Sequence, residues 1–227
     1  MAGLFWQPYL QQLNMERATV MIIDDHTLTR EIWATALGFD KRYEVVAATG
    51  DGKEAAEIAR QKRPQLVLLD INMEPMSGFQ VLAQIRKYAP GSKVIGVSMY
   101  SQPVYARKLL REGAKGYVTK SSPRAELMQA MEDVLAGKTY ICKEVRDIVK
   151  YLSDSPDASE HVAAINLLSA REIEIIGYIR QGLSSKEIGA RIFITPQTVE
   201  VHRHNILKKL KLKNAAALIQ FISNAGW

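Results

Sequence analysis

Two adjacent carboxylates end the apolar run V-M-I-I-D-D of residues 20–25, and a second short run, Q-L-V-L-L-D, ends in Asp70. Like charges repel each other, and an ionised carboxylate that loses its water costs several kcal/mol. If both runs are neighbouring strands of a parallel sheet, Asp24, Asp25 and Asp70 meet at one edge. Such a cluster is tolerable around a divalent cation, and its hard oxygen ligands favour Mg²⁺. The cation would also hold a phosphoryl group that a carboxylate can accept.

Two further runs end in a hydroxyl and an ammonium. Ser98 closes K-V-I-G-V-S-M, and Lys120 closes G-Y-V-T-K. Both groups are suited to binding phosphoryl oxygens. Each residue alone is more often a turn, cap or solvated residue, but five such groups at one predicted sheet edge indicate a single site.

The elements that must position these groups alternate along residues 19–141. Five short apolar runs, partly β-branched, read as strands, and amphipathic segments between them read as helices. The predicted helices cover residues 28–37, 53–61, 79–88, 105–111 and 124–135. This alternation predicts an α/β fold, a doubly wound (βα)5 parallel sheet with helices on both faces.

The rest of the chain predicts an all-α domain after a linker. The polar segment S-D-S-P-D-A-S-E of residues 153–160 has almost nothing to bury and is the best linker candidate. Four helical patterns and no strand-like run follow it. We expect a poorly ordered leader over 1–15, a sheet domain over 16–141, a linker over 142–162 and a helical domain over 163–227.

Helix caps divide the helical domain. Ser169 and Glu172 form a capping box, and Gly182 suits the end of that helix. Ser184 or Ser185 can cap a short second helix, and Thr195 caps a third, with Pro196 at its first position. A short second helix joined tightly to the third is typical of a helix-turn-helix, whose second helix enters the DNA major groove.

The spacing of this third helix separates its faces. Val199, Ile206 and Leu210 should pack inward, whereas Val201 should point outward, where it suits a thymine methyl. Glu200 suits the amino group of cytosine. The outward stripe and the basic residues that suit base or phosphate contacts comprise Gln197, Val201, His204, Lys208 and Lys209.

Charge and composition agree with this division. The chain carries 30 Lys and Arg against 24 Asp and Glu, a net charge of +6. Residues 162–227 hold 9 of the basic and 4 of the acidic residues, so +5 of the total lies there, as nucleic-acid binding requires. A single cysteine, Cys142, favours a reducing cytoplasm. No apolar run approaches the roughly 18–20 residues that span a membrane.

At these residues the chain resembles the receiver domain of bacterial two-component response regulators, over about residues 16–141. The matching stretches are I-I-D-D-H, L-L-D-I-N-M-E-P-M-S-G, V-I-G-V-S-M-Y and G-A-K-G-Y-V-T-K. The resemblance implies that Asp70 is the phosphoacceptor, that Asp24 and Asp25 are the acidic pair, and that Ser98 and Lys120 are switch residues. Tyr117 takes the place of the family's aromatic switch.

The same resemblance implies a Mg²⁺ site. Its ligands would be Asp25, Asp70 and the main-chain carbonyl of Asn72, with Asp24 acting through water. One departure is Glu74, since the family usually has proline four residues after the acceptor. Glu74 is therefore expected to add negative charge near the pocket and to alter metal affinity or phosphorylation rate.

The segment 168–222 resembles the LuxR-type DNA-binding domain through L-S-A-R-E-I-E-I, G-L-S-S-K-E-I-G-A-R-I and T-V-E-V-H-R-H-N-I-L-K-K-L. A receiver followed by this domain is the arrangement of the NarL/FixJ subfamily. The resemblance implies that five residues lie near DNA: Lys186, Gln197, Thr198, Arg203 and Asn205. It also implies that the last helix, residues 215–222, forms a dimer.

The favoured hypothesis is a cytoplasmic transcription factor, not an enzyme, that a histidine kinase switches by Mg²⁺-dependent phosphorylation of Asp70. It would bind double-stranded DNA as a homodimer and no membrane. One alternative is a transcription factor on the same scaffold that works without phosphorylation. Another is a phosphohydrolase with an aspartate nucleophile, although such enzymes usually need a carboxylate where this chain has Asn72.

Overall fold

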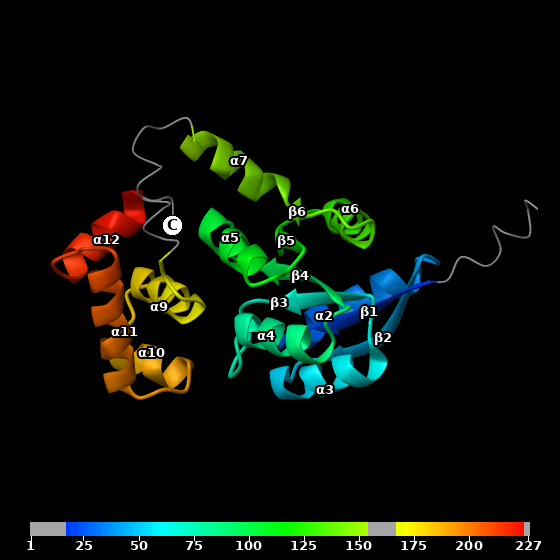
Figure 1. Ribbon diagram of the computed structural model, residues 1–227, viewed down its shortest axis with the longest axis horizontal. Helices are drawn as coiled ribbons and strands as arrows, with labels where there is room; N and C mark the ends of the chain where they lie inside the picture. The colour runs from blue at the N-terminus through cyan, green and yellow to red at the C-terminus, as the bar shows by residue number, and fades with distance from the viewer. Residues whose placement is uncertain (1–16, 154–166, 225–227) are drawn as a thin grey trace, which may run out of the picture.

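The computed structural model describes residues 17–153 and 167–224, which form a sheet unit (β1 to α7) and a helical unit (α9 to α12). Figure 1 shows the two units side by side, with the arrowhead of β3 pointing toward the helical unit. The leader expected over 1–15 lies outside the described residues. Within the described ranges, no helix has the length and apolar character needed to cross a bilayer.

Six parallel strands form the sheet, in the order β2-β1-β3-β4-β5-β6. Strands buried on both faces need nearly continuous apolar runs, and all five residues of β3 are buried. The strands are β1 (Ala18–Ile23), β2 (Tyr43–Thr49), β3 (Leu66–Asp70), β4 (Lys93–Ser98), β5 (Gly116–Thr119) and β6 (Tyr140–Ile141).

Six helices belong to the sheet unit. They are α2 (Thr27–Gly38), α3 (Gly52–Lys62), α4 (Gly78–Tyr88), α5 (Pro103–Arg111), α6 (Arg124–Leu135) and α7 (Lys143–Ser153). The first five lie where the sequence predicted them. α3 packs against α4, and Arg124 of α6 donates a hydrogen bond of 3.0 Å to the carbonyl of Ala36 in α2.

The chain after β5 differs from the expected linker. β6 adds a short sixth strand to the five that the sequence predicted, and α7 is a helix that packs against α5 inside the range 142–162 assigned to the linker. Buried Cys142 and Val145 anchor this segment, and Glu144 accepts hydrogen bonds from Thr119 and Ser121 at 2.9 and 3.0 Å. Of the polar segment 153–160, Ser153 ends α7 and the remainder lies outside the described residues.

The helical unit comprises α9 (Ala170–Arg180), α10 (Ser185–Arg191), α11 (Pro196–Lys209) and α12 (Ala215–Asn224). Capping boxes start α9 at Ser169 and α10 at Ser184, and Thr195 caps α11. Gly182 follows α9 with φ +82°, a backbone conformation that glycine adopts without steric cost. These predicted boundaries are confirmed, and Ser184 rather than Ser185 is the cap of α10.

Candidate acidic pocket and candidate nucleic-acid interface

Three carboxylates meet where β1 and β3 end. The two strands are neighbours in a parallel sheet, so Asp24 and Asp25, just beyond β1, lie beside Asp70, the last residue of β3. Asp24 and Asp70 are 4% and 1% exposed. One ligand atom from each of these carboxylates and one from His26 all lie within 4.8 Å of one another. The donor set therefore suits a divalent cation.

Lys120, just beyond β5, partly neutralises this cluster. Its Nζ lies 2.7 Å from Asp70 Oδ2 and 2.9 Å from Asp24 Oδ2. Burial alone would lower the pKa of Lys120, but its hydrogen bonds to the two carboxylates outweigh burial and raise it. The ammonium is therefore charged at neutral pH and offsets only part of the negative charge that the carboxylates can carry, which leaves the pocket suited to a divalent cation.

Asp70 is the most enclosed of the three carboxylates. Burial raises its pKa, and the hydrogen bonds from Lys120 and from the amide of Asn72 only partly offset this effect. That amide lies 2.8 Å from Asp70 Oδ1. The fold thus makes the ionised form of Asp70 costly, and this cost falls when a cation enters the pocket.

Ser98 and Asn72 are joined across the neighbouring strand ends. The Ser98 hydroxyl, fully buried, donates to Asn72 Oδ1 at 2.9 Å, and the amide of Tyr100 donates to Ser98 Oγ at 3.1 Å. The sequence placed Ser98 and Asn72 near the pocket but gave no sign of this bond between their side chains, because it depends on the loop after β3.

Tyr117 of β5 connects to the same loop. Its ring is fully buried, and its hydroxyl donates to the carbonyl of Tyr100 at 2.6 Å. Burial raises the pKa of this phenol, so the hydroxyl remains a neutral donor. The residue expected to be an aromatic switch therefore contacts the segment that follows Ser98.

Glu74 contacts both the acidic pocket and the helical unit. Its amide donates a hydrogen bond of 3.1 Å to Asp25 Oδ2. Its carboxylate accepts a hydrogen bond of 3.4 Å from the hydroxyl of Tyr178 in α9 and lies 3.8 Å from Arg191 Nε in α10. The carboxylate that was expected to add negative charge near the pocket thus contacts the helical unit. The sequence did not indicate this contact.

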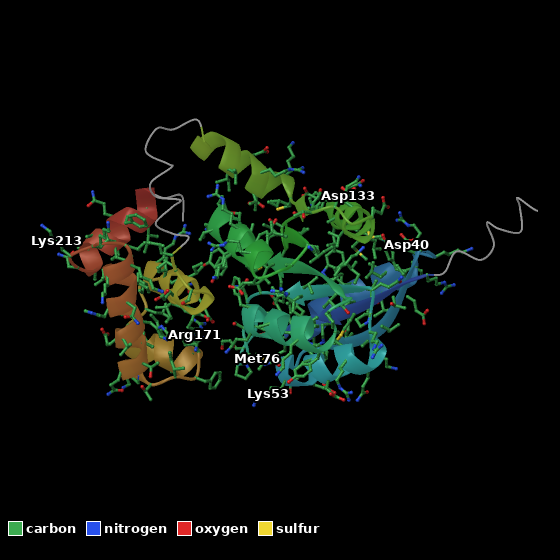
Figure 2. The ribbon with its side chains drawn as sticks, viewed as in Figure 1. Asp40, Lys53, Met76, Asp133, Arg171 and Lys213 are labelled. Carbon is green, nitrogen blue, oxygen red and sulfur yellow. The ribbon has the colours of Figure 1, made fainter. Side chains whose placement is uncertain are left out.

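The predicted inward face of α11 is confirmed. Val199 and Ile206 are fully buried and Leu210 is 7% exposed, while Val201 is 58% exposed. Other candidate DNA contacts with exposed side chains are Lys186, Gln197, Thr198, Glu200, His204 and Lys208, and Asn205 is half-buried. Figure 2 places Lys213 on the outer side of the helical unit, away from the sheet.

Three candidate DNA contacts are engaged within the helical unit. Ser185 donates to Glu200, and Arg203 Nη1 donates to Ser185 Oγ at 3.2 Å. Lys209 Nζ lies 2.7 Å from Glu172 Oε2, whose side chain is 3% exposed. Lys209 thus joins α11 to α9, whereas its neighbour Lys208 has an exposed side chain.

Comparison with known proteins gives two family matches. Residues 20–132 match the response regulator receiver domain, and residues 166–222 match the bacterial regulatory proteins of the luxR family. The "oxygen regulatory protein NreC" of Staphylococcus carnosus is 32% identical over 206 residues, which cover 89% of this chain and 95% of that protein. The protein of the same name from Staphylococcus aureus strain JH9 has the same identity and coverage.

Solved structures match both units. A LuxR-family two-component response regulator from Aurantimonas sp. SI85-9A1 is 30% identical, with a TM-score of 0.59, and covers 62% of this chain and 100% of that one. RcsB from Salmonella enterica serovar Typhimurium, bound to promoter rprA in the presence of the phosphomimetic BeF3−, is 19% identical. It has a TM-score of 0.66 and covers 92% of this chain and 99% of that one. At this identity the likeness shows the fold alone.

Proposed function

The chain belongs to the two-component response regulators of the NarL/FixJ subfamily, DNA-binding regulators with a receiver and a LuxR-type domain, and we propose that Asp70 is its phosphoacceptor. The observation that carries this proposal is the convergence of Asp24, Asp25 and Lys120 on Asp70, with Nζ at 2.7 Å from its Oδ2. A buried carboxylate beside two acids and an ammonium is placed to accept a phosphoryl group, and Mg²⁺ bound there would offset the added negative charge.

In the proposed reaction an oxygen of Asp70 attacks the phosphorus of a phosphohistidine on a histidine kinase. The new P–O bond forms as the P–N bond breaks, and the imidazole leaves with its electron pair and takes up a proton. Lys120 and the hydroxyl of Ser98 would bind the transferred oxygens. A bound Mg²⁺ would neutralise charge on the phosphoryl group, held by Asp25, Asp70 and the carbonyl of Asn72, with Asp24 acting through water.

The output would be binding to duplex DNA in the cytoplasm by a homodimer. The exposed stripe of α11 supports base contacts by Gln197, Val201 and His204, and Lys208 and Lys186 suit phosphate. The exposed Ile219 of α12, 53% accessible, supports a dimer through that helix. Two half-sites would then lie about one helical turn, or a multiple of it, apart.

Incorporation of a phosphoryl group tests the proposal. Wild type, Asp70→Asn and Asp147→Asn are incubated with Mg²⁺ and acetyl phosphate and weighed as intact proteins, and Asp147, exposed on α7, is the matched control. One added phosphoryl group is expected on wild type and on the control but none on Asp70→Asn. A parallel titration with a duplex should show tighter DNA binding by the modified proteins.

Three outcomes would contradict this scheme. Modification of Asp70→Asn to the same extent as wild type would place the acceptor elsewhere. DNA binding that does not change with phosphorylation would support the transcription factor that works without it. Repeated turnover of a phosphomonoester would favour the phosphohydrolase, against which stands Asn72 at the position where such enzymes need an acid.

A further inference from the structure

A cavity lies between the two units, outside the acidic pocket. Its volume is about 300 Å³, at the lower end of the range for small-molecule sites, which occur preferentially where domains meet. Figure 1 shows α9 beside α5 at this junction. The lining residues come from the loop after β4, from α5 and from the end of α9: Tyr100, Gln102, Tyr105, Gly177, Arg180 and Gln181.

On the sheet unit, Gln102 brings an unpaired hydrogen-bond acceptor to the cavity. Its Oε1 atom is buried and has no hydrogen-bond partner among the described residues. Gln102 is the N-cap residue of α5, but its side chain makes no cap bond, and glutamine is not among the good caps. A buried acceptor left unpaired costs free energy. A ligand that carries an N–H or O–H group would remove this cost.

On the helical unit, Arg180 brings an unpaired cation to the cavity. No carboxylate of the described ranges lies within 4.0 Å of its guanidinium. By contrast, Arg171 lies 2.7 Å from a carboxylate oxygen of Glu174, and Arg191 lies 3.8 Å from one of Glu74. An exposed arginine is usually solvated, but the guanidinium of Arg180 is always charged and its donors match a carboxylate.

The remaining wall suits a flat ring. The rings of Tyr100 and Tyr105 are stacked on each other, and Gly177 of α9 places no side chain in the space beside them. Aromatic rings pack favourably in offset-stacked or edge-to-face arrangements. The cavity therefore combines an aromatic wall, a hydrogen-bond acceptor and a cation, which together select for one kind of molecule.

We propose that this cavity binds a small aromatic carboxylate that carries a hydrogen-bond donor. The ring lies against Tyr100, the donor bonds to Gln102 Oε1, and the carboxylate pairs with Arg180. Gln102 belongs to the sheet unit and Arg180 to the helical unit. The ligand therefore binds the arrangement in which the units are in contact and stabilises that arrangement.

The ligand also acts on the receiver through Tyr100. The amide of Tyr100 donates to Ser98 Oγ at 3.1 Å, and its carbonyl accepts from the hydroxyl of Tyr117 at 2.6 Å. Ser98 and Tyr117 are switch residues of the proposed function, on which this part of the inference rests. A ligand that holds Tyr100 in place favours the present arrangement of both, so it opposes phosphorylation.

Ligand-detected NMR titrations of the full chain, without metal, test the site. The probes are para-hydroxybenzoate, benzoate, which lacks the donor, and para-hydroxybenzamide, which lacks the charge. Wild type is compared with Gln102→Met and Arg180→Gln. Lys62→Gln is the matched control, because it removes a positive charge from an exposed position at the end of α3.

Wild type is expected to bind para-hydroxybenzoate about two- to tenfold more tightly than benzoate, as one hydrogen bond would give. Gln102→Met should remove this preference, because a thioether is only a weak acceptor. Arg180→Gln should weaken binding of both carboxylates about tenfold or more and leave the amide probe unaffected. Lys62→Gln should bind like wild type.

Three results overturn the inference. The first is the absence of saturable binding to wild type, which would leave a cavity that holds only water. The second is a preference for para-hydroxybenzoate that persists in Gln102→Met. The third is an equal loss of affinity in Arg180→Gln and Lys62→Gln, which would show that the carboxylates respond only to net charge.

Phosphorylation separates this inference from the proposed function. A concentration of para-hydroxybenzoate that saturates wild type should slow phosphoryl incorporation from acetyl phosphate and Mg²⁺ about twofold or more in wild type, but not in Arg180→Gln. If wild type incorporates no phosphoryl group with Mg²⁺ alone, the proposed function fails while the NMR titrations still decide whether the cavity is a ligand site. Equal rates in wild type with and without the probe overturn the coupling through Tyr100.

Discussion

The Asp70 carboxylate is 1% exposed, and its ionised form has two other acids beside it. Its pKa in the folded protein is raised by burial, in spite of Lys120. A raised pKa means that the folded state holds the proton more tightly than the unfolded chain does. The stabilising contribution of the protonated group is complete below the unfolded pKa of about 3.9 and is lost as pH rises through the folded pKa.

Asp70→Asn is therefore expected to unfold at a temperature a few degrees higher than wild type at pH 7 in EDTA. The difference should shrink as pH falls toward 4, because wild-type Asp70 then becomes neutral as well. Thermal unfolding followed by circular dichroism across this pH range measures it. A wild type that is more stable than the variant at pH 7 would show that Lys120 outweighs the burial of Asp70.

The backbone conformation of Phe193 is a second local cost in free energy. It adopts φ +53° in the turn between α10 and α11 and is 67% exposed. The left-handed conformation costs a residue with a Cβ roughly 1 kcal/mol, while the exposed ring contributes little burial. Phe193→Gly is expected to stabilise the protein by about 0.5–1 kcal/mol in urea unfolding. Phe193→Ala keeps the strained φ and should give no gain.

Sequence reasoning succeeded best for residues whose position follows from a strand end or a helix cap. Asp24, Asp70, Ser98 and Lys120 were predicted to converge because parallel strands end at one edge, and hydrophobic spacing put Val201 outside. The contacts of His26 and Glu74 were not predicted, because they depend on loop conformation and on how the two units pack. Neither loop conformation nor the packing of the two units produces a periodic pattern in the sequence.

Among the elements, α11 carries two adjacent lysines with different roles. Lys208 is exposed, whereas Lys209 is bound to the buried Glu172 of α9. Burial raises the pKa of Glu172, but the hydrogen bonds from Lys209 and Ser169 outweigh burial and lower it. The ionised pair therefore links α11 to α9, and the stability that Glu172 contributes is lost as pH falls through its folded pKa.

This contrast predicts opposite effects for two neighbouring substitutions. Lys208→Ala should weaken duplex binding and reduce the slope of log affinity against log salt by about 0.9, with unchanged stability. Lys209→Ala should lower the unfolding free energy by about 1–3 kcal/mol, because it leaves Glu172 buried without its partner. Fluorescence anisotropy over a salt series and urea unfolding distinguish them. Equal loss of stability in both variants would contradict the assignment.

The helix α7 was not predicted from the sequence. It begins at Lys143, two residues after β6 ends at Ile141, inside the range 142–162 that the sequence assigned to a linker. Burial of Val145 against the sheet unit, and the bonds of Glu144 to Thr119 and Ser121, come from tertiary contacts. Tertiary packing stabilises most helices of this length, since isolated ones are marginal in water.

For the whole molecule, the decisive contact joins α9 to Tyr105 of α5 and to Tyr100 in the loop after β4. The rings of Tyr100 and Tyr105 stack with their centroids 4.6 Å apart, and Gly177 of α9 sits against them. A Cβ at Gly177 would lie 2.8 Å from the hydroxyl oxygen of Tyr105. Glycine is therefore needed here for the close approach of the two units, although it weakens the helix.

Gly177→Ala should separate the units, because the added Cβ cannot fit while Tyr105 keeps its place. Small-angle scattering should show a larger radius of gyration, although alanine favours helix α9 by about 1 kcal/mol over glycine. The double variant with Tyr105→Phe removes the clashing oxygen and should restore compactness. A single variant as compact as wild type would show that the tyrosine pair moves aside.

The outward stripe of α11 stays open to solvent while Glu74 and the tyrosine pair hold α9. An accessible cationic surface makes association with DNA fast, whether or not the acidic pocket is phosphorylated. Related protein–DNA complexes differ chiefly in their dissociation rates. Phosphorylation should therefore lengthen the dwell time on a promoter far more than it hastens arrival there. Between signals, the unmodified protein would already be sliding along the chromosome, and single-molecule tracking on stretched DNA would observe this as frequent, short visits.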